Sequence, residues 1–554
     1  MGKGEKGMED HRCEVILLQT SDVHGCLLPR SYADQSEVCY GLARVASIIK
    51  EERRKHKQVL LMDSGDSLQG TPLTYYHARV NSTPAHPVIA CMNELGYDAA
   101  GIGNHEFNYG LPYLERTMKE ARFPWLSANI LDTATGQPKF GPPYLIKELP
   151  LGLRIGILGL TTSYIPNWER PEHIAGLTFS DPVEAARTWV HHMKEHERAD
   201  VIVVAYHGGL ERDVKTGVPT EPLTGENVGI ALCQQVPGID VLLTGHQHRS
   251  LAGYEVNGVC VVQPGYEGRA LGKVTLQLAN EGDGWKLLHK QSELVGADDY
   301  EPDPVIEDKV REVEALTQAW LDQPIGEVDG DLSIHAPAEV RLSEHPLIEW
   351  INRVQMDVSG ADVSCTALFD NRSSGFGAVI TMRDLVTFYV YPNTLKVLRI
   401  SGRDLREALE QSAQYFTLDD TGAIIVHPAY LAPKPQHYNY DMWEGIEYTL
   451  DISRPAGQRV TRLEHNGRPV VDHQAFDVVM NNYRASGGGN FEMFRDKPVV
   501  KDIPMDMVEL LADYITSHGR ITASVNHNWL VVGGHSPAPD LARGSAETRT
   551  RAGR

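Results

Sequence analysis

Short hydrophobic runs alternate with polar loops and amphipathic stretches over the first 300 residues of the chain. The runs are rich in leucine and β-branched residues, and they predict strands over 15–18, 59–62, 155–160, 201–205, 241–243 and 259–262. Between them, amphipathic patterns predict helices over 42–57, 87–95 and 182–197. Asp181 is a suitable N-cap for the last of these, with Pro182 at the first helical position. The alternation predicts an α/β domain.

A different pattern begins near residue 298. The acidic, proline-containing segment 298–304 interrupts the alternation, and hydrophobic positions at helical spacing over 305–321 predict a connecting helix. Beyond it, the pattern predicts a smaller α+β domain with helices over 345–358, 404–415 and 505–518 and a strand over 447–452. The final segment has little hydrophobic content and predicts a disordered tail. The predicted boundaries are therefore 1–300, 301–325 for the connecting helix, 326–534, and 535–554 for the tail.

The composition is that of a globular protein with a strong acidic excess. The 554 residues include 52 Lys and Arg against 74 Asp and Glu, which gives a formal net charge of −22. This charge disfavours binding to nucleic-acid polymers and to anionic membranes, because both would be repelled by it. An anionic substrate therefore requires a locally positive site.

Targeting signals and cysteine pairs are also missing from the sequence pattern. No apolar run reaches the length of a membrane-spanning helix, and the N-terminal segment lacks the apolar region of a secretory signal. We therefore expect a cytoplasmic protein with no membrane partner; an exported form with a different start codon is the alternative. The seven cysteines are scattered and form no CxxC pair. We expect them to be reduced and mostly buried.

Glycine-flanked polar residues follow the hydrophobic runs at five places. The motifs are Asp-Val-His-Gly at 22–25, Gly-Asp at 65–66, Gly-Asn-His-Glu at 103–106, His-Gly-Gly at 207–209 and Gly-His-Gln-His at 245–248. Taken alone, each motif is equally typical of a turn or a helix cap. If the strands are aligned in one sheet, however, all five loops gather at one edge. Their succession predicts a cluster of Asp, Asn and His side chains.

This cluster has the donor chemistry of a divalent metal centre. Nitrogen and oxygen donors without thiolates suit Zn²⁺, Mn²⁺, Fe²⁺ or Co²⁺, and seven side chains are too many for one tetrahedral site. We predict two sites that share a carboxylate: Asp22, His24, Asp66 and His248 around one ion, and Asp66, Asn104, His207 and His246 around the other. Two divalent ions with two aspartates leave a charge of about +2, which attracts phosphate. Such a pair also activates water and holds the oxygens of an in-line displacement.

The order of these motifs resembles the signature of the calcineurin-like metallophosphoesterases, whose fold is a mixed β-sandwich flanked by helices. With the second domain, the chain from residue 14 to about 529 is similar to the superfamily of bacterial 5′-nucleotidases and 2′,3′-cyclic-nucleotide 2′-phosphodiesterase/3′-nucleotidases. The resemblance implies that the seven clustered side chains are the metal ligands and that the smaller domain is a nucleotidase-type, substrate-binding domain. It also implies that His105 is the catalytic histidine beside the phosphate.

One position separates the branches of this superfamily. In the 5′-nucleotidase branch, the Gly-Asn-His-Glu motif continues to an Asp that pairs with the catalytic histidine, whereas this chain has Asn108. The segments 103–110 and 438–445 are similar instead to the cyclic-phosphodiesterase branch. We therefore predict His105 and Asn108 as the catalytic residues. The alternative is that Asn108 only orients His105 through a neutral hydrogen bond and says little about the substrate.

Two loops of the second domain carry the predicted nucleotide contacts. Tyr391 begins the segment 391–394, and Tyr483 lies in the segment 481–491, which contains three successive glycines. A phosphate-binding loop is disfavoured because neither Lys-Ser or Lys-Thr nor a clear helix start follows, whereas a glycine turn can bring an aromatic ring close to a ligand. The resemblance implies that the two tyrosines sandwich the nucleobase; for either ring, an ordinary half-buried packing role is the alternative. Asn482, Arg484 and Arg372 are further candidate substrate contacts.

Together these features predict a two-domain, dinuclear metal-dependent hydrolase of small nucleotides. The favoured activity is that of a 2′,3′-cyclic-nucleotide 2′-phosphodiesterase and 3′-nucleotidase. A 5′-nucleotidase or UDP-sugar hydrolase is the main alternative, and a nucleotide-binding protein with a decayed site is a second. We expect closure about the connecting helix to complete the site, because the ligands and the tyrosines lie on separate domains. The sequence leaves open the metals, the physiological substrate and the oligomeric state.

Overall fold

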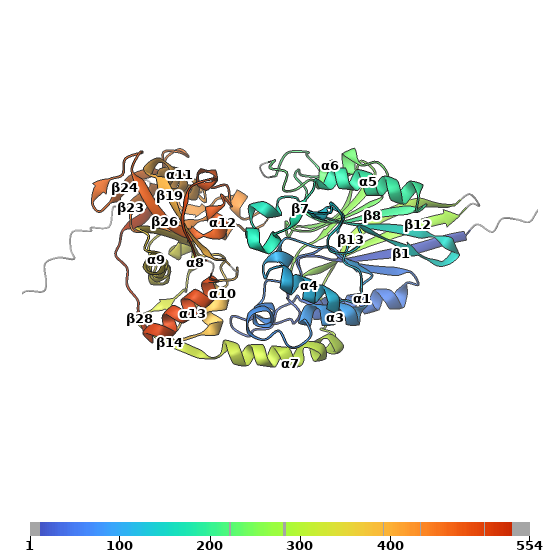
Figure 1. Cartoon of the computed structure of the whole chain (residues 1–554), viewed down its shortest axis with the longest axis horizontal. Coiled ribbons are helices and arrows are strands. Elements are labelled where there is room, and N and C mark those ends of the chain that lie inside the picture. The colour runs from blue at the N-terminus through green and yellow to red at the C-terminus, as the bar shows by residue number, and fades with distance from the viewer. Residues whose placement is uncertain are drawn as a thin grey trace, which may run out of the picture.

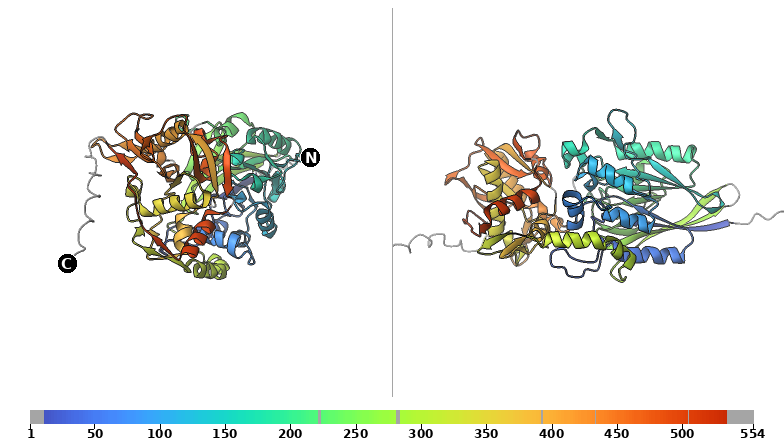
Figure 2. Two further views of the ribbon diagram at one scale, coloured as in Figure 1. Left: turned by 60° about the vertical axis from the view of Figure 1, so that its left-hand side comes forward. Right: turned by 60° about the horizontal axis from the view of Figure 1, so that its bottom comes forward.

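The computed structural model describes residues 11–533, apart from 221–222, 281–283, 392, 433 and 504. These residues form two lobes, and helix α7 (Pro304–Leu321) runs beneath the N-terminal lobe toward the C-terminal lobe (Figures 1 and 2). Within the described part of the chain, no helix is both long and apolar enough to cross a membrane. The tail predicted over 535–554 lies outside the described residues.

Two β-sheets form the centre of the N-terminal lobe, with strand orders β13-β12-β1-β2-β3 and β10-β11-β9-β8-β6-β5. The strands of the first sheet are β1 (His11–Thr20), β2 (Val59–Asp63), β3 (Ala99–Ala100), β12 (Ala270–Asn280) and β13 (Trp285–Gly296). Those of the second are β5 (Tyr144–Glu148), β6 (Arg154–Thr161), β8 (Val201–His207), β9 (Val241–Thr244), β10 (Ser250–Val256) and β11 (Val259–Pro264). Strands β1 to β3 are parallel to one another, as are β6, β8, β9 and β11. Their carboxyl ends therefore share one edge of each sheet.

Alternate residues of the central strands face different hydrophobic layers. In β1, Val15 and Leu17 lie in the core between the two sheets, whereas Ile16 and Leu18 lie in the core beneath the helices. Helices α1 (Leu42–Lys55), α3 (Pro87–Leu95) and α4 (Leu111–Glu120) cover the first sheet, and α5 (Pro182–Glu195) and α6 (Gly229–Gln235) cover the second. Because both faces of these strands are buried, they appear in the sequence as continuous apolar runs. The predicted β-sandwich flanked by helices is confirmed.

The C-terminal lobe has a core of its own, extending from Leu321 to Val531. Its largest sheet has the order β22-β16-β26-β19-β27, and a second sheet has the order β25-β24-β23-β29. The strands are β16 (Val363–Ala367), β19 (Leu395–Ser401), β22 (Asp441–Glu444), β26 (Ala475–Asn481), β27 (Val499–Ile503), β23 (Glu447–Asp451), β24 (Val460–His465), β25 (Arg468–Pro469) and β29 (Trp529–Val532). The main helices are α9 (Pro346–Ser359), α10 (Met382–Phe388), α11 (Gly402–Ala413) and α13 (Met507–His518). The predicted α+β class is confirmed.

Smaller elements complete the two lobes. They are α2 (Pro72–Tyr75), α8 (Pro337–Val340), α12 (Asn482–Ala485) and the strand pairs β4 (Ile130–Asp132) with β7 (Leu177–Phe179), β15 (Leu332–Ser333) with β17 (Gly375–Phe376), and β20 (Phe416–Leu418) with β21 (Ile424–Val426). Strands β14 (Pro324–Asp329), β18 (Val379–Thr381) and β28 (Arg520–Thr522) form a further sheet.

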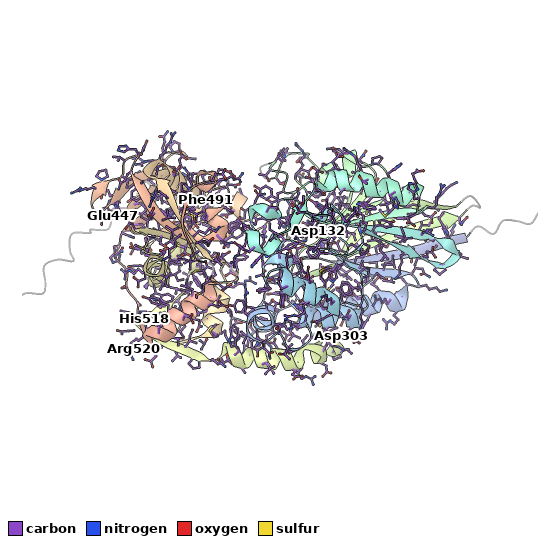
Figure 3. All side chains as sticks on the ribbon, in the orientation of Figure 1. Asp132, Asp303, Glu447, Phe491, His518 and Arg520 are labelled. Atoms are coloured by element: carbon purple, nitrogen blue, oxygen red, sulfur yellow. The ribbon has the colours of Figure 1, made fainter. Side chains whose placement is uncertain are left out.

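Helix α7 and a few polar contacts hold the lobes against each other. Asp303 caps the start of α7 (Figure 3), and near its end the Trp320 ring stacks on Tyr75 of the N-terminal lobe at 5.9 Å. Arg383 of α10 donates a hydrogen bond of 2.7 Å to the backbone oxygen of Tyr32. Gln69 Nε2 donates one of 3.2 Å to the backbone oxygen of Val390, beside Tyr391. The lobes therefore touch close to the predicted site.

Several predicted element boundaries are wrong by a few residues, for local reasons. Helix α1 ends at Lys55 rather than residue 57 because His56 is extended. Helix α13 begins at Met507 because Asp506 caps it, and α11 begins at Gly402 because Ser401 does. The predicted N-cap role of Asp181 is confirmed by its bonds to two backbone N–H groups. The domain boundaries themselves stay a prediction.

The cysteines agree with the expectation of unpaired thiols. Among the described residues all seven are free, five of them are buried, and Cys39 is exposed.

Candidate functional site

The predicted donor residues converge at the carboxyl ends of the parallel strands. Asp22 and His24 follow β1, Asp66 follows β2, Asn104 follows β3, and His246 and His248 follow β9. One expectation is wrong in detail: His207 is the last residue of β8, not a member of the loop after it. Because β8 is parallel to β9, this position still places His207 at the same edge of the sheet.

Six of these side chains form two compact groups, and the seventh lies against one of them. The groups are Asp22, His24 and His248, and Asp66, His207 and His246; within each, the donor atoms lie within 4.8 Å of one another. Asn104 Oδ1 lies 3.1 Å from His207 Nε2. The geometry shows two groups of donors, with Asp66, which was expected in both, grouped with His207 and His246.

Backbone carbonyls fix the orientation of two of the histidines. His24 Nδ1 lies 2.9 Å from the backbone oxygen of Gln69, and His207 Nδ1 lies 2.9 Å from that of Ser64. A carbonyl oxygen only accepts hydrogen bonds, so each Nδ1 carries a proton, and the lone pair of the neutral ring lies on Nε2. His24 Nε2 is 3.0 Å from His248 Nε2. Two ring nitrogens this close together can bind one cation.

His246 is oriented by a carboxylate instead. Its Nε2 lies 2.8 Å from Glu226 Oε1, so the N–H of this ring is on Nε2 and the lone pair is on Nδ1. A carboxylate paired with the far nitrogen of a metal-binding histidine fixes the ring and makes it a more basic ligand. The sequence patterns did not identify Glu226.

Burial and mutual charge set the protonation of the cluster. Burial lowers the pKa of His24 to about 3 and lowers the pKa of His248 well below its usual value, which keeps both rings neutral, the form that binds metals. Burial also raises the pKa of Asp22. Burial opposes the charged form of His207 as well, but Asp66, 3.1 Å away, raises the pKa of His207 to about 10. A cation entering this group therefore replaces a proton.

The backbone at the site adopts conformations that non-glycine residues rarely take. Five donors have positive φ angles: Asp22 (52°), His24 (51°), Asp66 (59°), His246 (67°) and His248 (56°). Such conformations cost on the order of 1–3 kcal/mol each and concentrate at functional sites. The motif glycines permit the close loop packing, since a Cβ on Gly103 would lie 2.2 Å from Asp66 Oδ1. The loops are held in shapes that serve the cluster.

Glu106 joins two of these loops and was not assigned a role from the sequence. It is 1% exposed, and its carboxylate accepts hydrogen bonds from four backbone N–H groups, those of Asp66, Ser67, Leu68 and Gly103, at 2.6–3.1 Å. The Gly-Asn-His-Glu motif contains this residue, but nothing local in the sequence shows that it reaches back to 66–68. Glu106 therefore sets the position of Asp66 relative to Asn104.

His105 lies beside the cluster and pairs with Asn108, the contact expected under the alternative in which Asn108 orients the ring; its catalytic role stays a prediction. His105 Nδ1 is 2.7 Å from Asn108 Oδ1, and the His105 backbone N–H donates to Asp66 Oδ1 at 2.8 Å. The ring also lies edge-on to His24, with centroids 5.2 Å apart. With Nδ1 occupied, Nε2 is the ring nitrogen available to a ligand.

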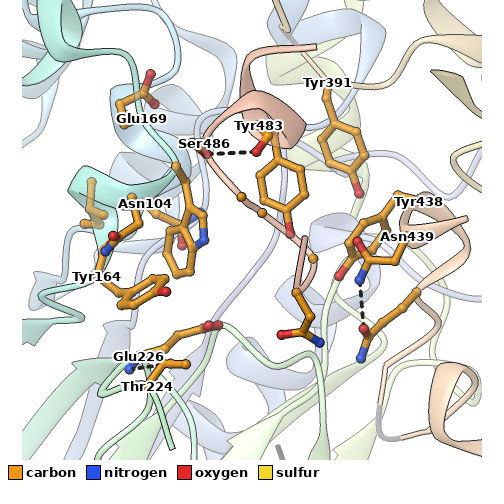
Figure 4. Close-up of a pocket in the computed structure, with 18 of the residues that line it drawn as sticks. Asn104, Tyr164, Glu169, Thr224, Glu226, Tyr391, Tyr438, Asn439, Tyr483 and Ser486 are labelled. Carbon is orange, nitrogen blue, oxygen red and sulfur yellow. Dashed lines mark hydrogen bonds between the residues drawn. The ribbon is translucent and has the colours of Figure 1, made fainter. Parts of the chain in front are cut away.

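A cavity of about 300 Å³ between the lobes connects the metal-type donors with the predicted base-binding residues. Asn104, His105 and His246 line it from the N-terminal lobe, and Tyr391, Asn482 and Tyr483 line it from the C-terminal lobe. Figure 4 shows Tyr391 and Tyr483 across the cavity from Asn104, Tyr164 and Glu226. The structure thus brings together residues far apart in the sequence.

Tyr438 completes the aromatic wall of this cavity. Its ring lies edge-on to Tyr391 at 6.2 Å and to Tyr483 at 6.3 Å. Two hydrogen bonds of 2.9 Å between Asn482 and the backbone of Thr394 connect the two tyrosine loops. The glycine run has a direct use here, because a Cβ on Gly488 would lie 2.7 Å from the Tyr483 ring. Tyr438 lies in the segment 438–445, whose resemblance to the cyclic-phosphodiesterase branch gave no separate role to this residue.

Neither predicted arginine appears among the described residues that line this cavity. Arg484 is buried behind the aromatic wall, where it pairs with Asp441 at 2.6 Å and donates to the backbone oxygens of Tyr438 and Gly488. Arg372 pairs with Asp370 and, across the lobes, with Glu267 at 2.9 Å, and it lines a second cavity. In this arrangement Arg484 supports the loops that carry Tyr438 and Tyr483, and Arg372 links the lobes.

Comparisons with known proteins agree with this geometry. Residues 16–250 match the family model for calcineurin-like phosphoesterases, and residues 324–496 match that for the C-terminal domain of 5′-nucleotidases. The Salmonella typhimurium 2′,3′-cyclic-nucleotide 2′-phosphodiesterase/3′-nucleotidase is 30% identical, over 94% of this chain and 89% of that protein.

Two further relatives cover most of this chain. The Bacillus subtilis trifunctional nucleotide phosphoesterase YfkN is 28% identical over 93% of the chain, which spans only 39% of the length of YfkN. A solved Staphylococcus aureus structure, described as a candidate 5′-nucleotidase in complex with alpha-ketoglutarate, superposes with a TM-score of 0.86 at 37% identity, over 94% of this chain and all of that one.

Proposed function

Because the chain belongs to the calcineurin-like phosphoesterases that carry a 5′-nucleotidase C-terminal domain, we propose that it is a 2′,3′-cyclic-nucleotide 2′-phosphodiesterase and 3′-nucleotidase. Its family and fold make it a hydrolase of phosphoric esters, and this family uses a divalent metal centre. The proposal concerns the finer points: the substrate, the number of ions and the role of each residue.

The single observation that supports this function most is the cavity that joins two kinds of side chain. Metal-type donors and His105 lie at its N-terminal wall, and three tyrosines lie at its C-terminal wall. A nucleotide has the matching parts, an anionic phosphate and an aromatic base joined by a ribose. Stacking on a tyrosine contributes roughly 1–3 kcal/mol per base and tolerates any base.

We assign two divalent ions to the two donor groups, with Asp66 shared and Asn104 in the second group. The donor set fits Zn²⁺, Mn²⁺, Fe²⁺ or Co²⁺, because it contains imidazole and carboxylate but no thiolate. When bound, such a pair activates water near neutral pH and stabilises the attacking and leaving oxygens of an in-line displacement.

The protein side chains then orient the substrate and move a proton. In the proposal the base lies between the rings of Tyr391 and Tyr483, and Tyr438 closes one end of the space between them. His105, whose Nδ1–H is held by Asn108, carries a second proton on Nε2 when it stabilises the developing charge or protonates the leaving oxygen. A 2′,3′-cyclic phosphate opens to the 3′-monoester, which is hydrolysed in a second turnover.

The choice of branch rests on Asn108 and on the named relatives. An Asp at this position would hold a protonated His105 by charge, as in the 5′-nucleotidase branch, whereas Asn108 holds it through a neutral amide oxygen. A 5′-nucleotidase is the second candidate, favoured by the Staphylococcus aureus structure.

A substrate panel tests the assignment. The purified protein, stripped with a chelator and reloaded with Mn²⁺ or Zn²⁺, is assayed against 2′,3′-cAMP, 3′-AMP, 5′-AMP and UDP-glucose. We expect the highest kcat/KM for 2′,3′-cAMP, followed by 3′-AMP. A higher value for 5′-AMP would overturn the branch assignment, and release of no product from any of the four would contradict the nucleotide substrate.

A further inference from the structure

Behind Asn108, the structure places a buried carboxylate that sequence patterns did not reveal. Glu169 lies in the loop after the turn Ile165–Asn167, its side chain is 6% exposed, and it is among the residues that line the cavity (Figure 4). Its Oε2 accepts a hydrogen bond of 2.7 Å from Asn108 Nδ2. Its Oε1 accepts one of 2.8 Å from the backbone N–H of Arg170 and lies 2.9 Å from His173 Nδ1.

This carboxylate determines which way the amide of Asn108 points. An ionised carboxylate can only accept hydrogen bonds, so Asn108 must turn its NH₂ group toward Glu169. Its oxygen then faces His105 Nδ1 at 2.7 Å and accepts that N–H. The hydrogen bonds that join His105, Asn108 and Glu169 can therefore be donated in only one direction, from His105 toward Glu169. In this arrangement His105 Nδ1 carries a proton and Nε2 is turned to the substrate side.

Without Glu169, the polarity of the pair would be undetermined. An isolated amide can present either its oxygen or its NH₂ group to a neighbour. If Asn108 presented its NH₂ group, two hydrogen-bond donors would face each other, because His105 Nδ1 also carries a proton. A carboxylate behind the amide also polarises it and strengthens the bond at its oxygen. Glu169 is thus the group that makes Asn108 a reliable acceptor.

We propose that Glu169 is a positioning residue for the reaction, which supplies through Asn108 the anionic support that an Asp at position 108 would supply directly. The inference rests on the proposed function, because the orientation of His105 matters only if His105 acts on a phosphoester. It assigns a role to a residue that is distant in sequence from every motif of the site.

The first test removes the charge and keeps the shape. For Glu169→Gln, kcat toward 2′,3′-cAMP and toward the artificial diester bis(p-nitrophenyl) phosphate should fall about 10- to 100-fold, with KM within about 2-fold of wild type. The matched control is Glu172→Gln, a nearby glutamate whose side chain is 70% exposed, and it should behave as wild type. A wild-type kcat for Glu169→Gln would overturn the proposal.

The second test exchanges the two groups. Asn108→Asp alone places two carboxylates at a separation now occupied by a 2.7 Å hydrogen bond, so it should lose activity as well. The double variant Asn108→Asp/Glu169→Gln restores an amide paired with a carboxylate, in reverse order, and should recover kcat to within about 3-fold of wild type. A double variant no better than Glu169→Gln would contradict the polarity argument, whereas a loss of folding would lower all these variants alike.

A third readout does not depend on turnover. Long-range ¹H–¹⁵N correlation spectra of protein labelled at histidine report the tautomer of each ring, and His105→Gln identifies the signals of His105. We expect the Nδ1–H tautomer in wild type and a mixture in Glu169→Gln; identical spectra would overturn the role of Glu169. If the wild-type protein hydrolyses none of the nucleotides, the proposed function fails, while this spectrum still decides whether Glu169 sets the tautomer of His105.

Discussion

The two walls of the interlobe cavity differ in both chemistry and construction. The N-terminal wall presents carboxylates and imidazoles on loops at strand ends, with five donors in left-handed backbone conformations. The C-terminal wall presents tyrosines on two loops that are connected by the bonds of Asn482 to Thr394. Burial raises the pKa of Tyr391 to about 12, so that ring stays uncharged at neutral pH. One wall is built for charge, the other for an aromatic surface.

The difference agrees with the proposed separation of the reaction, on the N-terminal wall, from base recognition, on the C-terminal wall. On the N-terminal wall, position is determined by buried polar groups such as Glu106, whose bonds leave little freedom to the ligands. On the C-terminal wall, Arg484 fixes the loops from behind without entering the cavity. Changes on the first wall should therefore affect metal content and kcat, and changes on the second should affect KM.

The largest effect should follow from Asp66→Asn. This change removes the carboxylate assigned to both ions, and since even the outer partners of metal ligands contribute 10- to 100-fold, we expect metal affinity to fall by more than about 100-fold. Metal content after dialysis, measured by mass spectrometry, should drop together with kcat, while nucleotide binding is retained in part. The control is Asp308→Asn on α7, whose side chain is 68% exposed. Full metal content in Asp66→Asn would contradict the ligand assignment.

A smaller effect, of the opposite kind, is expected on the aromatic wall. Tyr391→Ala and Tyr483→Ala should each weaken binding of 2′,3′-cAMP by roughly 1–3 kcal/mol, or about 5- to 150-fold in KM. Turnover of bis(p-nitrophenyl) phosphate, which has no nucleobase, should change little in kcat. Tyr391→Phe keeps the ring and should keep KM. An equal loss on both substrates would mean that the tyrosines do more than bind the base.

Glu106→Gln should perturb the N-terminal wall with a moderate effect. A glutamine has one acceptor oxygen, so some of the four backbone N–H groups now bonded to Glu106 would lose their partner, at about 1–3 kcal/mol of stability. The urea midpoint should fall, and metal affinity should fall with it because Asp66 shifts. An unchanged midpoint and affinity would show that Glu106 does not organise the ligand loops.

The smallest effect concerns a contact between the lobes, where Asp506 caps α13 and its carboxylate lies 3.4 Å from the hydroxyl of Tyr75. Burial raises the pKa of Asp506 to about 6, above its value in the unfolded chain, so its favourable contribution is complete below about pH 4 and is lost as the pH rises through 6. Asp506→Asn keeps a good N-cap without the charge. The thermal midpoint of Asp506→Asn, measured relative to that of wild type, should rise by a few degrees as the pH is raised from 4 to 7. A difference between the two midpoints that does not change with pH would contradict the raised pKa of Asp506.

The sequence was sufficient to predict the fold class and the seven donors because both depend on local patterns. Strands buried on both faces appear as continuous apolar runs, and parallel strands bring the polar residues after them to one edge. Asp22 and His248 could be placed in one cluster without knowing any contact between them.

Features that depend on distant side-chain contacts could not be predicted. Glu169 meets Asn108, and Glu226 meets His246, across segments with no common pattern. From the sequence, Arg484 is expected to contact the substrate. In the structure it is 1% exposed and pairs with Asp441 in the interior of the lobe. Its burial depends on a partner 43 residues away.

Anomalous diffraction from crystals grown with Mn²⁺ and a slowly hydrolysed phosphorothioate analogue of 2′,3′-cAMP tests the central claim most directly. The account predicts two manganese peaks, one among Asp22, His24 and His248 and one among Asp66, His207 and His246, with the base between Tyr391 and Tyr483. A single peak, or a base bound away from both tyrosines, would contradict it.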